Sequence, residues 1–159
     1  MEMLFLDDGR IIRPCGIDDL ESVSEMVLAE ARRSIFDDFD DTGWRDFEEY
    51  LSAEQLLKRL VTGSKALIVQ EADDSISGYI EILEIQVLLL FITERVQGLK
   101  LASRLLDRVR DTLDLRELYV NSSSAGYAFY QKSQFEPLEG WKREAGVKYR
   151  PLKWQKEKV

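Results

Sequence analysis

The chain has 159 residues, of which 45% are hydrophobic and 33% are charged, and its formal net charge is −8. These proportions are ordinary for a soluble globular protein, and we expect a single domain over residues 1–159. The acidic balance argues against nucleic acid and anionic membranes as partners, because both are bound through Lys and Arg. No apolar run approaches the roughly 20 residues that a membrane span needs.

Residue types that are absent or rare exclude further classes of protein. The chain contains no histidine, which excludes Ser-His-Asp hydrolysis, Cys-His proteases and His-ligated zinc sites. Its single cysteine, Cys15, has no disulfide partner within the chain, which favours a reducing, cytoplasmic compartment. We expect Cys15 to be a small residue at the end of a strand, and we expect no metal site.

Two helices are predicted in the first part of the chain. Asp18 and Glu21 have the spacing of a capping box, followed by apolar residues that share one helix face. Ser52 and Gln55 form a second capping pair, and Gly63 is placed to end the second helix.

The remaining elements predict a mixed α/β domain. Strands are expected, in chain order, at residues 10–14, 65–71, 76–84, 87–92 and 118–121, from Phe135, and at 144–152. Two further helices are expected at residues 102–113 and 125–133. The resulting order is β-α-α-β-β-β-α-β-α-β-β, and we expect disorder only in the tail after Trp154.

Acidic and aromatic residues are interleaved between the first two helices. The segment holds Phe36, Asp37, Asp38, Phe39, Asp40, Asp41, Trp44, Asp46, Phe47, Glu48, Glu49 and Tyr50. One interpretation is a solvated acidic loop that its aromatic residues anchor to the core. The other is an acceptor site, because carboxylates attract an ammonium group and aromatic faces add cation–π contacts. Both can hold if Trp44 and Phe47 pack while the Asp residues face a cleft.

A buried strand, a short polar loop and the start of a helix follow one another at residues 87–106. Free N–H groups and the positive end of the helix dipole make such a junction an anion site, and its preferred guest is a phosphate group. The loop has neither the spacing of a Walker A motif nor the three glycines of a dinucleotide fingerprint. An ordinary packed helix after a buried strand explains the pattern equally well.

Two motifs in this half of the chain resemble the GNAT superfamily of acetyl-CoA-dependent N-acetyltransferases. The first is Leu90-Phe91-Ile92 at a strand end, followed by Gln97-Gly98-Leu99-Lys100-Leu101-Ala102 at the head of a helix. The second is Asn121 on a strand, followed by Phe129-Tyr130-Gln131-Lys132-Ser133-Gln134-Phe135. The resemblance runs from about Arg10 to Trp154. Lys100 and Gln134 stand where the family usually has glycine, and Gln86 stands where related sequences often have histidine.

The resemblance implies a GNAT-like fold, with a central, mixed, mostly antiparallel sheet of about six to seven strands and about four flanking helices. It implies an N-acetyltransferase that uses acetyl-CoA and no metal, and that acetylates a primary amine of a small molecule or peptide by direct attack. Exposed final strands in such folds often pair, which makes a homodimer one expected arrangement. The alternative is a GNAT-fold module with little or no catalysis that binds acyl-CoA or a protein.

The resemblance also implies roles for particular residues. Backbone groups around Phe91 and Ile92 hold the pantetheine arm and polarise the thioester carbonyl, while N–H groups of residues 99–102 hold the pyrophosphate. The implied cofactor site comprises Phe91, Ile92, Gln97, Gly98, Leu99, Lys100, Leu101, Ala102, Asn121 and Phe129.

Tyr130 maps onto the general acid that protonates the departing thiolate, although the residue also reads as a core aromatic on an amphipathic helix. Glu81 and Glu84 are candidate bases on the strand before the signature strand, and the alternative is two solvated carboxylates. The candidate acceptor site comprises Phe36, Asp37, Asp38, Phe39, Asp40, Asp41 and Gln86.

Overall fold

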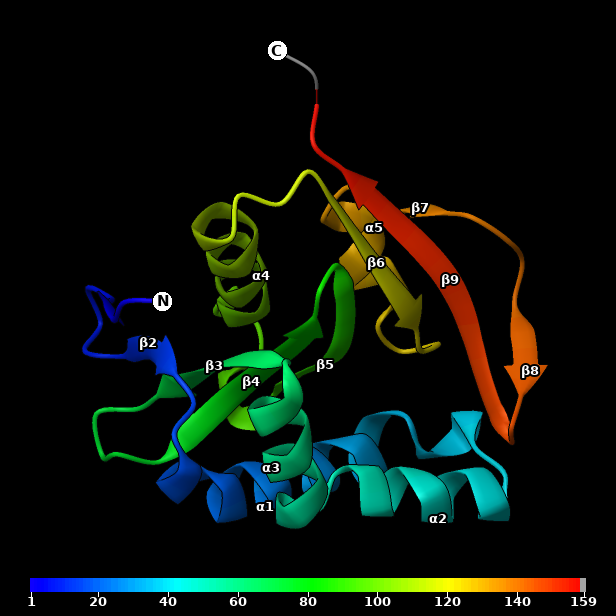
Figure 1. The fold of residues 1–159 in the computed structure, drawn as a ribbon, viewed down its shortest axis with the longest axis horizontal. Coiled ribbons are helices and arrows are strands. Elements are labelled where there is room, and N and C mark those ends of the chain that lie inside the picture. The colour runs from blue at the N-terminus through cyan, green and yellow to red at the C-terminus, as the bar shows by residue number, and fades with distance from the viewer. Residues whose placement is uncertain (158–159) are drawn as a thin grey trace.

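The computed structural model describes residues 1–157, in which the strands form a single sheet with helices on both faces (Figure 1). The strands are β1 (Leu4–Phe5), β2 (Ile11–Pro14), β3 (Lys65–Gln70), β4 (Ile76–Leu83), β5 (Gln86–Ile92), β6 (Glu117–Ser122), β7 (Glu136–Pro137), β8 (Lys142–Glu144) and β9 (Val147–Gln155). The α-helices are α1 (Leu20–Ser34), α2 (Asp41–Tyr50), α3 (Ala53–Thr62), α4 (Leu101–Thr112) and α5 (Tyr127–Lys132). None of these helices is both long and apolar enough to cross a bilayer.

The strand order along the sheet is β1-β2-β3-β4-β5-β6-β9-β7, and β8 pairs with β9 beside this path. Every neighbouring pair is antiparallel except β5 and β6, which are parallel. The predicted mixed, mostly antiparallel sheet is therefore confirmed. The described residues form nine strands. Two of them, β1 and β8, were not expected from the sequence, because strands this short carry no recognisable hydrophobic pattern.

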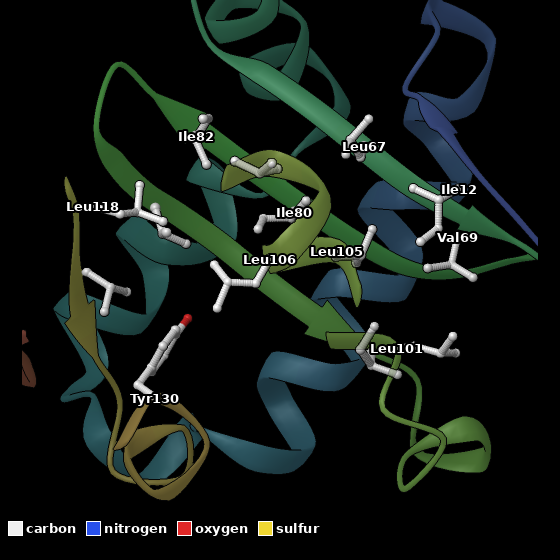
Figure 2. Packing of buried hydrophobic residues seen from close by; sticks show 14 of the residues in the cluster. Ile12, Leu67, Val69, Ile80, Ile82, Leu101, Leu105, Leu106, Leu118 and Tyr130 are labelled. Carbon is white, nitrogen blue, oxygen red and sulfur yellow. The ribbon is translucent and has the colours of Figure 1, made fainter. Parts of the chain in front are cut away.

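Two apolar clusters, one on each face of the sheet, form the core. On one face α4 and α5 pack through residues such as Leu105, Leu106 and Tyr130 against Ile80 of β4, as Figure 2 shows. On the other face α1, α2 and α3 pack against Tyr79, the next residue of the same strand. Successive side chains of a strand point to opposite faces, so β4 is buried on both sides.

The helix ends confirm one predicted cap and correct another. Ser52 caps α3 by accepting the N–H of Gln55 at 3.3 Å, and Gly63 ends that helix at φ +136°. The predicted cap at Asp18 is wrong. Asp19 instead accepts the N–H of Gly16 at 2.7 Å, which orders the turn before α1.

The acidic segment is helical and is not the predicted loop. Its second half forms α2, because the Asp40 carboxylate accepts the N–H of Gly43 at 2.7 Å and caps the helix. Trp44 is buried on α2, which confirms that the aromatic residues anchor this segment.

The predicted closing strand at 144–152 is also corrected. Residues 145–146 form a turn with positive φ between β8 and β9, and β9 continues to Gln155. The predicted disordered tail therefore begins too early, and residues 158–159 lie outside the described part of the chain.

The sheet opens between its two parallel strands. β5 and β6 pair only at Gln86 with Tyr119 and at Val87 with Val120, whereas β5 continues along β4 as far as Ile92. A register shift of β4 and β5 lies beside this point, between Glu81 and Ile82. Bulges of this kind bend a strand away from its neighbour. Figure 1 shows β5 and β6 diverging at the centre of the molecule.

Candidate active site

A cleft of about 840 Å³ opens where β5 and β6 diverge. Its inner walls are residues 87–92 of β5 and residues 120–121 of β6. The C-terminal end of α1, the N-terminal end of α5 and the hairpin formed by β8 and β9 complete the enclosure. Of the implied cofactor residues, the structure places these at the cleft: Phe91, Ile92, Gln97, Ala102, Asn121 and Phe129.

The loop before α4 is built to present free backbone N–H groups. The first N–H to be bonded within this helix is that of Arg104, which donates to the Lys100 carbonyl at 3.1 Å. The three preceding N–H groups, at residues 101–103, therefore have no acceptor within the helix. The Gln97 side chain donates from Nε2 to the Ile92 carbonyl at 2.9 Å, which ties the loop to the end of β5.

Lys100 occupies a backbone conformation that suits glycine. Its φ is +62° at the N-terminal boundary of α4, and Gly98 two residues earlier has φ +92°. The Lys100 side chain is exposed, as are those of Gln97 and Leu99. The side chain of Leu101 is buried in the core, where Figure 2 shows it, so this residue offers a ligand only its backbone.

Tyr130 lines the cleft from α5 with 7% of its surface exposed. Its ring meets Phe129 and Phe135 edge to face at 5.2 and 5.3 Å, and Figure 2 shows the hydroxyl at the end that stands away from the helix. No described residue forms a hydrogen bond with this hydroxyl. Burial raises the pKa of the Tyr130 phenol, which therefore stays protonated at neutral pH.

The structure does not bring the two candidate bases into the cleft. Glu81 is fully buried and pairs with Arg59 of α3 at 2.7 Å, while it accepts the Tyr79 hydroxyl at 2.8 Å. The expectation that a carboxylate here would be solvated is wrong for Glu81. Glu84 is exposed in the tight turn after β4, with φ +54°. Gln86 lies at the start of β5, where that strand still pairs with β6, outside the cleft lining.

The acidic segment contributes two of its candidate residues, Asp38 and Phe39, to the cleft. Asp38 is 7% exposed and accepts the N–H and the hydroxyl of Ser124 at 2.8 and 2.7 Å, which ties this segment to the loop after β6. The other candidates lie outside the lining. Phe36 packs against Trp44, Asp40 caps α2, and Asp37 and Asp41 are exposed.

Sequence reasoning missed the wall opposite the signature strand. It is formed by side chains from the end of α1, from α2 and from the β8–β9 hairpin: Arg33, Ile35, Phe47, Glu144, Val147, Lys148 and Tyr149. The turn at Ala145-Gly146 was the one local signal that the hairpin exists. Its approach to α2 depends on a contact across about a hundred residues of chain, in which the Asp40 N–H donates to the Gly146 carbonyl at 2.9 Å.

Comparisons with known proteins agree with this geometry. Residues 35–156 match the family model described as an acetyltransferase (GNAT) domain, whereas no curated protein matches the sequence. A GCN5-related N-acetyltransferase from Rhodopseudomonas palustris is similar with a TM-score of 0.77 and 14% identity, covering 98% of each chain.

Two further solved structures have the same fold. The PaiA N-acetyltransferase from Thermoplasma acidophilum, in complex with coenzyme A, has a TM-score of 0.77 and 20% identity over 92% of this chain and 99% of that one. A variant of the spermidine N-acetyltransferase SpeG from Vibrio cholerae has a TM-score of 0.63 and 19% identity over 92% and 93%.

Proposed function

The chain belongs to the GNAT acetyltransferase family, and we propose that it transfers the acetyl group of acetyl-CoA to the primary amine of a small molecule or peptide. One observation carries the proposal. The gap between β5 and β6 reaches both the free N–H groups at the start of α4 and the protonated phenol of Tyr130. A cofactor with a phosphate-bearing end and a thioester end requires both features in one cleft.

The residues present fit coenzyme A. The N–H groups at positions 101–103 point along the helix axis, where the helix dipole favours the pyrophosphate. The edge of β5 that faces β6 lacks a strand partner beyond Val87, so its backbone is free to hydrogen-bond the pantetheine amides. Phe91, Asn121 and Phe129 line the path between the two strands.

Tyr130 is the proposed general acid. The acceptor nitrogen attacks the thioester carbonyl carbon, the carbon–sulfur bond breaks, and the phenol of Tyr130 gives its proton to the departing sulfur. The backbone N–H of Ile92 stabilises the negative charge that develops on the carbonyl oxygen, because it faces the open edge of β5, whereas the N–H groups of Phe91 and Thr93 face β4. Glu81 and Glu84 lie outside the cleft lining, so the proton that the acceptor loses passes to water, and water returns a proton to the Tyr130 phenolate.

The experiment that tests the proposal combines binding with turnover. We expect calorimetry to show acetyl-CoA and CoA competing for one site, and we expect CoA thiol to be released when a panel of primary amines is added. Absence of binding at millimolar acetyl-CoA would contradict the proposal. Binding without thiol release from any amine would instead support the non-catalytic alternative, an acyl-CoA-binding module.

A further inference from the structure

The part of the cleft that lies beyond the proposed cofactor path has aromatic and aliphatic walls. Phe39 and Phe47 stack with their ring centroids 4.9 Å apart and their planes at 30°, and both line the cleft. Ile35 and Val147 add aliphatic surface, and Tyr149 adds a third ring. An acceptor bound in this space contacts apolar surface.

The carboxylates that line the cleft are already bonded to protein groups. Glu30 accepts from Arg33 at 2.8 Å through one oxygen and from the N–H of Glu94 at 3.0 Å through the other. Both oxygens of Asp38 accept from Ser124.

Glu144 is the third carboxylate of the lining, and it accepts the Tyr149 hydroxyl at 2.6 Å through Oε2. Among the described lining residues, this leaves one carboxylate oxygen, Glu144 Oε1, without a protein donor. This oxygen can accept a hydrogen bond from an ammonium group or an amine.

A positive side chain stands on the same wall. Lys148 lines the cleft with its Nζ 5.0 Å from the centre of the Trp141 ring, and it forms no ion pair with any residue in 1–157. A polyamine in this cleft would bring further ammonium groups among apolar walls and this cation. Burial of an ammonium group without a carboxylate partner is strongly unfavourable.

We propose that the acceptor is a monoamine carried on an aromatic or bulky apolar arm, and not a polyamine. This inference rests on the acetyl transfer proposed above. The arm packs on the Phe39 and Phe47 rings, and the single amino group remains at the reacting end of the cleft. The exposed acidic residues Asp37 and Asp41 do not line the space where a second amino group would lie.

The first test compares two amines in the same assay. With saturating acetyl-CoA, we expect kcat/KM for 2-phenylethylamine to exceed that for spermidine by about 10-fold or more, which is the scale of an aromatic contact. Equal values, or a preference for spermidine, would overturn the inference while leaving acetyl transfer intact. If neither amine is acetylated, calorimetry in the presence of CoA decides, because the inference also requires 2-phenylethylamine to bind more tightly than spermidine.

The second test substitutes residues that line the wall of the cleft. Phe47→Ala should lower kcat/KM for 2-phenylethylamine about 10-fold more than it lowers kcat/KM for propylamine, and Phe47→Leu should recover part of this difference. Phe5→Ala is the matched control, because Phe5 is 69% exposed on β1 and lies outside the cleft. Lys148→Glu should raise kcat/KM for spermidine about 10-fold by exchanging a cation for a carboxylate. Two results would overturn the inference. One is an equal loss of kcat/KM for 2-phenylethylamine and propylamine in Phe47→Ala, and the other is an unchanged kcat/KM for spermidine in Lys148→Glu.

Discussion

Tyr130 lines the cleft from α5, and burial there keeps its phenol protonated at neutral pH. We expect Tyr130→Phe to lower kcat by about 10²-fold or more, because the lost hydroxyl serves a transition state in which the sulfur gains a proton. The ring is retained, so acetyl-CoA affinity should be unchanged and the free energy of unfolding should fall by at most about 1 kcal/mol. Steady-state kinetics and calorimetry check both expectations.

Tyr127→Phe provides the control for this substitution. Tyr127 lies one turn earlier on α5, outside the cleft lining, and its hydroxyl bonds to Gln131 and Arg150. We expect kcat to stay near the wild-type value in this variant. Full activity of Tyr130→Phe would contradict the general-acid role and would indicate that Tyr130 is an aromatic residue of the core.

Lys100 combines an unfavourable backbone conformation with a positive charge beside the proposed pyrophosphate site. We expect Lys100→Gly to raise the free energy of unfolding by about 0.5–1 kcal/mol, since relief of a left-handed conformation outweighs the greater freedom of the unfolded chain. Acetyl-CoA affinity at low salt should fall about 2- to 5-fold and should depend less on ionic strength. Denaturant titration and calorimetry at two salt concentrations measure these effects.

Lys100→Gln separates the effect of the positive charge from the effect of the left-handed backbone conformation. It removes the ammonium group and keeps a side chain at φ +62°, so it should share the loss of affinity without the gain in stability. Tighter binding of acetyl-CoA by Lys100→Gly would show that the lysine side chain obstructs the site.

At the scale of elements, the contact between the β8–β9 hairpin and the start of α2 supports the cleft wall that we propose to receive the acceptor. Gly146 has φ +77°, and a Cβ on this residue would clash with the Asp40 carboxylate. We expect Gly146→Ala to lower the free energy of unfolding by about 1–3 kcal/mol. The KM for the amine should rise, because Val147 and Lys148 shift with the turn, whereas acetyl-CoA affinity should be unchanged.

Gly140→Ala is the control for the hairpin. Gly140 lies between β7 and β8, and a Cβ placed on it would have no heavy atom within 4 Å apart from its chain neighbours. Chemical denaturation and amine titrations should leave this variant near wild type. A Gly146→Ala protein with unchanged amine KM would mean that the hairpin does not shape the acceptor site.

At the scale of the whole molecule, the sequence predicted the elements whose formation depends on residues close together in the chain. The strand, loop and helix around residues 87–112 follow from short-range apolar spacing, and the first of the two GNAT motifs lies in these elements. Glu81 looked solvated from its own strand, and its burial depends on an ion pair with Arg59, which lies 22 residues earlier in another element. The acceptor wall was unpredictable for the same reason, because α1, α2 and the β8–β9 hairpin meet only after the sheet has formed.

Within residues 1–157, the two parts of the sheet, β1–β5 and β6–β9, are joined by two residue pairs of β5 and β6, and the proposed cofactor lies between these parts. A ligand that bonds to both parts binds the folded state alone, and at 100 times its dissociation constant it adds about 2.7 kcal/mol of stability. For a domain of this size we expect CoA at that concentration to raise Tm by about 5–10 °C in a thermal-shift titration.

ATP provides the comparison for this titration, since it carries phosphates and adenosine but no pantetheine arm. It can occupy the N–H groups at the start of α4 without spanning the gap, so its shift at equal concentration should be smaller than that of CoA. Equal shifts for ATP and CoA would mean that the space between β5 and β6 contributes nothing to binding. A larger shift for CoA would assign the excess to the arm that joins the two parts of the sheet.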